Sequence, residues 1–221
     1  IGACNFPLAI SVVGTDTAAA LSVGCTVVVK AHPAHPRTCQ LLADLVQLAM
    51  KKCEIPLGTF KLIHGENHTV TQNLVAQPNA SCIAFTGSLR GGSVLSKIVS
   101  QREKPIPFHA EMGSLNPVIA LPNKIEQDLA TLAQNYIQAV NLFAGQMCTK
   151  PGAFFILKSP DHSSLRQFIK EAVKQQEILP MLNGNIYENY EEGINFLKKA
   201  LPLLATNESN QDRIKNPAYC R

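Results

Sequence analysis

The sequence lacks several patterns that mark common functional classes. Its seven cysteines are odd in number and contain no C-x-x-C pair, which argues against a zinc ribbon or a disulfide framework and indicates a reducing compartment. It contains neither a G-x-S-x-G nucleophile elbow nor a P-loop ending in G-K-[ST], so those two chemistries are not predicted. Lys and Arg number 20 against 16 Asp and Glu and are scattered, so we expect neither nucleic acid nor a membrane surface as a partner.

A long apolar stretch is present, but it does not have the character of a membrane span. Residues 8–29 contain a single charge, Asp16. Gly14 and Gly24 interrupt the stretch and three valines end it, so we expect a buried helix and then a strand buried on both faces. With 46% hydrophobic and 16% charged residues, the chain is predicted to be soluble and cytoplasmic, with one large domain or two small ones.

Short apolar runs alternate with amphipathic helical patterns along the first half of the chain. Thr38 is predicted to cap the helix that follows Pro33 and Pro36, because two prolines disfavour an earlier start. The alternation predicts a doubly wound, Rossmann-like parallel sheet of the α/β class, whose ligands bind at the carboxyl ends of the strands. The expected strands are residues 25–30, 60–63, 81–85 and 106–110, and the expected helices are 7–24, 38–53, 69–76 and one that ends near 100.

The pattern changes after Gly113. We expect a strand at 116–121, a long helix from 125 to about 143 and a strand at 153–157, followed by helices near 165–175 and 188–201. A domain boundary is therefore placed near Ser114. It separates a domain at 1–113 from a domain at 114–221 that is part of a second α/β fold.

Cys148 is the first candidate for chemistry. It stands between small or polar neighbours, after a helical pattern and just before Pro151 and Gly152. A partly open, polar setting allows a thiol to become the nucleophilic thiolate. The alternative is that Cys148 packs as a small hydrophobic residue, as most cysteines do.

Three further polar residues stand beside predicted strands. Glu111 ends one strand and is either a general base for water or a surface charge. Asn5 follows a strand-like start, where its amide could donate to an oxyanion or simply form a turn before Phe6 and Pro7. Lys30 closes an apolar strand and either binds cofactor hydroxyls or is the first solvated residue beyond it.

The segment 87–92 is a glycine-bearing turn from a strand into a helix. Backbone N–H groups at such a turn can bind a pyrophosphate, although the segment is not a G-x-G-x-x-G fingerprint. The nearby candidates for metal ligation, His32, His35 and Cys39, match no zinc spacing and are only three in number. No metal site is therefore expected.

Five motifs occur in an order that resembles the aldehyde dehydrogenase superfamily: Asn5-Phe6-Pro7, Val28-Val29-Lys30, Phe85-Thr86-Gly87-Ser88, Glu111-Met112-Gly113 and Gly145-Gln146-Met147-Cys148. The variants around them are similar to the branch that contains 2-oxoglutarate-semialdehyde dehydrogenases and NADP-preferring fatty-aldehyde dehydrogenases. The resemblance covers the middle of a family subunit. We therefore expect this chain to be a central fragment of a longer protein.

The resemblance implies a catalytic set and a substrate. Cys148 would attack the aldehyde carbonyl, Asn5 and the Cys148 backbone N–H would hold the oxyanion, and Glu111 would activate water for thioester hydrolysis. The substrate would be a small-molecule aldehyde, such as 2-oxoglutarate semialdehyde. The domain at 114–221 would be the partial catalytic domain, and the longer protein is expected to be a homodimer or homotetramer.

The resemblance also implies a cofactor, NAD or NADP, held by the domain at 1–113. NADP is slightly favoured, because Pro33 stands where many NAD-preferring relatives carry an acidic residue. Lys30 would bind the adenosine ribose or a 2′-phosphate, and Gly65 would face the adenine. The remaining cofactor-binding residues would be Thr86, Gly87, Ser88 and Gly113, with Ser88 at the pyrophosphate.

Two other functions stay open at this point. The chain could hold NAD(P) weakly and turn over nothing, as an incomplete piece of such an enzyme. It could also be a cysteine hydrolase that pairs Cys148 with His109 or another base. The hydrolase hypothesis leaves Lys30 and the glycine turn unexplained.

Overall fold

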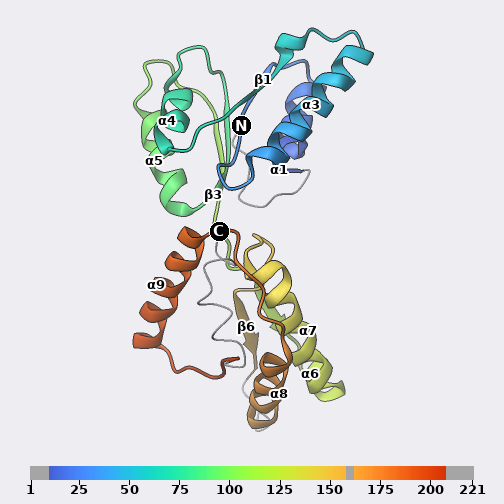
Figure 1. Cartoon of the computed structure of the whole chain (residues 1–221). Helices are drawn as coiled ribbons and strands as arrows, with labels where there is room; N and C mark the ends of the chain where they lie inside the picture. Colours follow the sequence, from blue (N-terminus) through green and yellow to red (C-terminus); the bar gives the residue numbers. More distant parts are fainter. Residues whose placement is uncertain (1–9, 158–161, 208–221) are drawn as a thin grey trace. The chain divides into compact units, whose positions relative to one another are not determined.

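The computed structural model describes residues 10–157 and 162–207 (Figure 1). The chain divides into two compact units, Ile1–Gly113 and Ser114–Arg221. Asn5, one of the predicted catalytic residues, lies outside the described residues.

The first unit contains four short strands that form two parallel pairs. β1 (Val27–Lys30) pairs with β2 (Phe60–Ile63), and β3 (Ile83–Gly87) pairs with β4 (Phe108–Met112). Each pair is joined by a helix, as a parallel connection requires. The helices and turns of this unit are α1 (Ile10–Val13), α2 (Thr15–Ser22), α3 (Pro36–Lys52), η1 (Leu57–Thr59), α4 (His68–Ala76) and α5 (Leu89–Ser100).

The second unit repeats the same plan once. β5 (Pro117–Ala120) and β6 (Ala153–Ile156) form a third parallel pair. All six expected strands are thus present and parallel, which confirms the α/β class, although the described strands form three two-stranded sheets instead of one continuous sheet. The other elements are α6 (Pro122–Gln127), α7 (Leu129–Asn141), η2 (Leu142–Gly145), α8 (His162–Gln175) and α9 (Gly184–Ala200).

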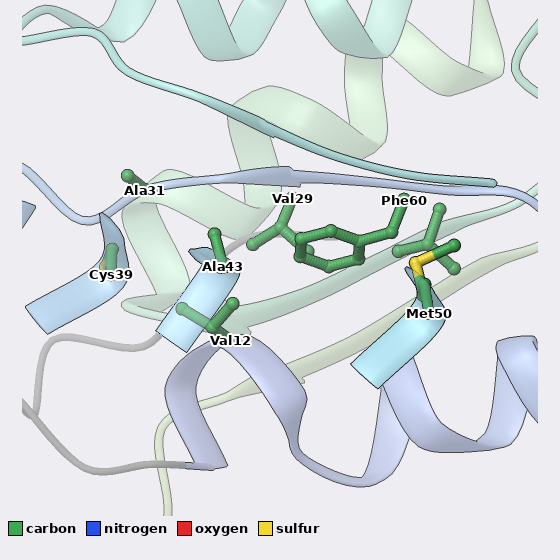
Figure 2. Packing of buried hydrophobic residues seen from close by; sticks show 8 residues of the cluster. Val12, Val29, Ala31, Cys39, Ala43, Met50 and Phe60 are labelled. Carbon is green, nitrogen blue, oxygen red and sulfur yellow. The ribbon is translucent and has the colours of Figure 1, made fainter. Parts of the chain in front are cut away.

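A hydrophobic cluster between α1, α3 and the β1–β2 pair forms the main core of the first unit (Figure 2). Phe60 is fully buried in it, at 0% exposure, and Met50 packs beside it from the end of α3. Cys39 and Ala43 are four residues apart and lie on one face of α3. A second cluster of Val75, Ile83, Leu95 and Val99 packs α4 and α5 against β3.

β1 is buried on one face only, so the expectation of burial on both faces was wrong. Val27 and Val29 are buried, whereas Val28 between them is 37% exposed. Successive residues of a strand point to opposite sides of the sheet. Among the described residues, α1 and α3 therefore cover one face of β1, while its other face is less covered.

Several helix boundaries differ from the sequence-based expectation. The helix expected at 7–24 is divided at Gly14 into α1 and α2, and two further differences have a clear physical reason. α3 begins at Pro36 with His35 as its N-cap, not at Thr38, because proline has a helical φ and its missing N–H is not needed in the first turn. The long helix expected from residue 125 is divided at Asp128 (φ −165°, ψ 86°) into α6 and α7. The Asp128 carboxylate accepts a hydrogen bond of 3.0 Å from the Thr131 N–H and caps α7, and this interaction lowers the pKa of Asp128.

The loop between β1 and α3 carries two stacked histidines. The His32 and His35 rings lie 5.0 Å apart with an interplanar angle of 12°. His35 is buried, and its Nδ1 lies 3.3 Å from the Cys39 sulfur. Burial first, and then the neighbouring His35 and Lys30, lower the pKa of His32 from 6.5 to about 4.

No helix among residues 10–157 and 162–207 is both long and apolar enough to cross a membrane. Within the same described residues, no group of three or more His, Cys, Asp or Glu side chains is placed to hold a metal ion.

The histidine loop predicts how the stability of the first unit depends on pH. The unfolded chain binds a proton at His32 near pH 6.5, whereas the folded unit does so only near pH 4. The free energy of unfolding should therefore fall as the pH is lowered from about 6.5 to about 4. Urea titrations across this range should show a smaller loss in His32→Gln. The exposed His68 gives the matched control, and a His68→Gln variant that flattens the profile as much would contradict the assignment to His32.

Arg102 should contribute measurably to the stability of the first unit. Its guanidinium donates hydrogen bonds to the carbonyl oxygens of four residues at the end of α4 and in the loop from α4 to β3: Val75 at 2.8 Å, Gln77 at 2.8 Å, Pro78 at 3.2 Å and Ala80 at 3.0 Å. A lysine ammonium cannot span these four acceptors, so Arg102→Lys should cost about 2 kcal/mol. Amide hydrogen exchange of residues 75–87 measures this locally. Arg37→Lys, at an exposed arginine of α3, is the control and should leave that exchange unchanged.

Candidate active site and nucleotide-binding loops

The carboxyl ends of β3 and β4 bring two of the predicted functional segments together. Thr86 stands opposite Glu111 in the strand register, and Gly87 stands opposite Met112. Neighbouring strands lie about 5 Å apart, so the start of the glycine turn and the candidate base share one sheet edge. Glu111 is exposed, and so is His109 two residues earlier on the same side of β4. This is the edge at which ligands of parallel sheets bind.

Ser88 leads from this edge into α5 as the N-cap of the helix. Its hydroxyl accepts a hydrogen bond of 3.1 Å from the Gly91 N–H, and its carbonyl accepts one of 2.9 Å from the Gly92 N–H. A Cβ on Gly92 would overlap the Met112 side chain at its sulfur, so α5 lies close to β4 at this glycine and a larger residue would displace Met112. The first turn of a helix presents N–H groups without partners inside the helix. The geometry is therefore suited to an anionic group such as a phosphate.

Lys30 and Gly65 stand at the carboxyl ends of the other strand pair. Lys30 is opposite Ile63, and the next residue, Ala31, donates a hydrogen bond of 2.8 Å to the Ile63 carbonyl. Lys30 is half-buried, and this burial lowers the pKa of its ammonium group. A Cβ on Gly65 would lie 2.7–2.9 Å from the Val70 side chain, so this loop passes against α4 only because residue 65 is glycine.

Cys148 belongs to the second unit and its side chain is exposed. The chain approaches it through three consecutive left-handed residues, Phe143 (φ 53°), Ala144 (φ 56°) and Gly145 (φ 69°). This conformation ends the helical region before Cys148, and residues 146–150 form turns and bends. The Gln146 side chain holds the start of the loop, since it donates to the Phe143 carbonyl at 3.0 Å and accepts from the Leu182 N–H at 2.9 Å.

The carbonyl oxygen of Cys148 is held by two side chains that sequence reasoning missed as functional candidates. It accepts a hydrogen bond of 2.6 Å from the Asn116 side-chain nitrogen and another from the Ser114 hydroxyl. Asn116 has φ 45°, a conformation that asparagine tolerates better than most residues. An asparagine at such a bend was the signal available in the sequence, but its partners are 32 residues away along the chain.

The predicted site residues therefore fall into separate groups. Thr86, Gly87, Ser88 and Glu111 are gathered at the β3–β4 edge, with Gly113 (φ 69°) just beyond β4. Lys30 and Gly65 lie at the β1–β2 edge. Cys148 belongs to the second unit, together with Ser114 and Asn116.

Comparison with known proteins identifies the family of this chain. A family pattern described as "Aldehyde dehydrogenase family" matches residues 1–186. The α-ketoglutaric semialdehyde dehydrogenase of Acinetobacter baylyi is 41% identical over 196 residues, covering 89% of this chain and 37% of that protein. The α-ketoglutaric semialdehyde dehydrogenase 2 of Azospirillum brasilense is 38% identical over 192 residues, with 87% and 37% covered.

A solved structure shows the same fold. Glyceraldehyde-3-phosphate dehydrogenase GapN from Methanocaldococcus jannaschii, complexed with NADP, has a TM-score of 0.73 at 24% identity, covering 88% of this chain and 43% of that one. The chain spans a little over a third of the length of the two α-ketoglutaric semialdehyde dehydrogenases. The resemblance seen in the sequence motifs is confirmed, and the chain belongs to the aldehyde dehydrogenase family.

Proposed function

We propose that the full-length protein oxidises an aldehyde to a carboxylic acid with NAD or NADP, using Cys148 as the nucleophile. The observation that carries the proposal is the exposed Cys148 thiol on a loop whose backbone carbonyl is fixed by Ser114 and Asn116. A nucleophilic thiol must be both accessible and oriented. Family membership supports the reaction type.

The proposed reaction assigns one bond change to each residue. The Cys148 thiolate attacks the aldehyde carbon, and the Asn5 amide and the Cys148 backbone N–H stabilise the resulting oxyanion. NAD(P), when bound, supplies the acceptor for the hydride that leaves this carbon, so that a thioester with Cys148 remains. Glu111 then takes a proton from a water molecule that attacks the thioester carbon. The carboxylic acid departs and the thiolate of Cys148 is regenerated.

The described residues fit a dinucleotide in three places. The first turn of α5, capped by Ser88, offers N–H groups to a pyrophosphate. Lys30 stands at the β1–β2 edge, where it would bind ribose hydroxyls or a 2′-phosphate, and Gly65 has no side chain that would cover an adenine. Thr86, Gly87 and Gly113 complete the proposed cofactor-binding set at the β3–β4 edge.

The proposed substrate is 2-oxoglutarate (α-ketoglutarate) semialdehyde or a similar aldehyde. Support comes from the 41% and 38% identity to two proteins named α-ketoglutaric semialdehyde dehydrogenases. A panel of aldehydes that includes this compound and long-chain species, assayed with the full-length protein, tests the assignment. A kcat/KM for long-chain aldehydes far above that for the semialdehyde would overturn it.

The roles of Cys148 and Glu111 predict two different kinetic defects. Cys148→Ala should abolish aldehyde oxidation, because no thiohemiacetal can form. Glu111→Gln should retain a first-turnover burst of NAD(P)H but lose steady turnover about 10²–10⁴-fold, because thioester hydrolysis lacks its base. Stopped-flow absorbance at 340 nm separates the burst from the steady rate.

Matched variants control for general damage to the protein. Cys82→Ala removes another exposed thiol, and Glu103→Gln removes another exposed carboxylate. Both should keep wild-type burst and steady rates. Near-normal steady turnover in Cys148→Ala or in Glu111→Gln would refute the corresponding role.

The residue at position 33 predicts the cofactor preference. Pro33 is exposed and offers no carboxylate to repel a 2′-phosphate, so kcat/KM should be higher with NADP than with NAD. Pro33→Glu should lower kcat/KM for NADP at least about tenfold and change the NAD value little. Pro56→Glu, at an exposed proline after α3, is the control. A strong NAD preference of the wild-type enzyme would contradict the assignment.

A further inference from the structure

Four hydrogen bonds join the segment after Gly113 to the loop that carries Cys148. Ser114 and Asn116 donate to the Cys148 carbonyl, and Asn116 also donates to the Lys150 carbonyl at 2.9 Å. From the opposite direction, the Gly152 N–H donates to the Leu115 carbonyl at 2.7 Å. All of these residues belong to the second unit.

The chemistry of Asn116 matches this position closely. Its amide nitrogen has two hydrogens, which serve the carbonyls of Cys148 and Lys150, while the Ser114 hydroxyl supplies its own hydrogen to Cys148. Two carbonyl oxygens can only be faced by a donor, so the orientation of the amide is unambiguous. A carboxylate of the same shape would instead present lone pairs to both oxygens.

Apart from the two hydrogen bonds of the Gln146 side chain at its start, few other hydrogen bonds of the described residues define the backbone of the loop around Cys148. Residues 146–150 are in turns and bends, and three left-handed residues precede them. Within the described residues 147–150, one main-chain hydrogen bond is present, from the Lys150 N–H to the Met147 carbonyl at 3.1 Å. The side chains of Asn116 and Ser114 therefore fix the peptide plane between Cys148 and Thr149, and with it the point from which the thiol projects.

We propose that Asn116, assisted by Ser114, is a positioning residue that sets where the Cys148 thiol stands for attack on a bound aldehyde. The inference deepens the proposed function and rests on it for the aldehyde step. A displacement of about 1 Å at a reacting group can cost about a hundredfold in rate. Loss of the Asn116 amide therefore slows the chemical step without removing the thiol or the cofactor-binding residues.

The test uses three variants of the full-length protein. Asn116→Asp keeps shape and tolerance of a positive φ but removes the donors. Ser114→Ala removes the hydroxyl, and Ser114→Thr restores it. Asn189→Asp, on α9, is the matched control because it also removes an amide that donates to a backbone carbonyl, that of Asn185 at 2.7 Å.

The kinetics of the variants give the first part of the test. Asn116→Asp should lower the burst rate constant about tenfold to a hundredfold, Ser114→Ala less, and Ser114→Thr should recover most of the wild-type rate. KM for the cofactor should change less than about twofold, since its proposed ligands are untouched. Alkylation of Cys148 by iodoacetamide needs an accessible thiolate but no positioned aldehyde, and Ser114→Ala adds no charge. In this variant the alkylation rate should therefore stay near wild type relative to the exposed Cys25, Cys53 and Cys82.

Hydrogen exchange of residues 146–153 makes the structural part of the test independent of the proposed function. Exchange there should quicken in Asn116→Asp and not in Asn189→Asp. Unchanged exchange in Asn116→Asp overturns the proposal, and so does quicker exchange with an unchanged burst rate constant. The proposal is also overturned if Ser114→Ala and Ser114→Thr have the same reduced burst rate constant. If the wild-type protein forms no NAD(P)H with any aldehyde, the proposed function fails. Hydrogen exchange then still tests the hold on the Cys148 loop, which quicker exchange in Asn116→Asp supports and unchanged exchange overturns.

Discussion

Parallel pairing of neighbouring strands is the constraint on which the candidate nucleotide site depends. Because β3 and β4 run in the same direction in register, their last residues reach one edge together. This places Thr86 beside Glu111, although the two residues are 25 positions apart in the sequence. The same rule brings Lys30 next to Ile63 at the end of the β1–β2 pair. The hydrogen bonds between the strand backbones bring these polar residues to one edge, so the residues need no contact with one another.

Close approach at glycines completes what the strand pairing begins. A side chain at Gly92 would collide with Met112, and one at Gly152 would place its Cβ 2.5 Å from the Leu115 carbonyl oxygen. The first glycine allows α5 to lie against β4 with its N-terminus at the sheet edge. The second allows the two loops of the second unit to exchange hydrogen bonds. At both positions glycine serves close packing and not a turn of the backbone.

Much of the fold was predictable because the local sequence pattern indicates most of its helices and strands. The apolar runs of β1 to β6 and the one-sided pattern of α3 predicted strands and a helix within a few residues of their observed bounds. Positions that depend on distant partners were not predictable in this way. The Asp128 break and the left-handed residues Phe143 and Ala144 interrupt a sequence with good helical periodicity. The roles of Asn116 and Ser114 rest on carbonyls more than 30 residues away, which no local pattern encodes.

The electrostatics of the β1–β2 edge bear on the proposed cofactor preference. Burial lowers the pKa of both Lys30 and His32, since each loses water that would stabilise its positive charge. A dianionic 2′-phosphate bound beside them would oppose this effect and favour the protonated forms. Its binding would then be linked to proton uptake and would strengthen as the pH falls. A ribose hydroxyl brings no such charge, so NAD bound at this edge would lack the linkage. The binding of NADP relative to NAD would then strengthen as the pH falls, as long as the 2′-phosphate stays dianionic.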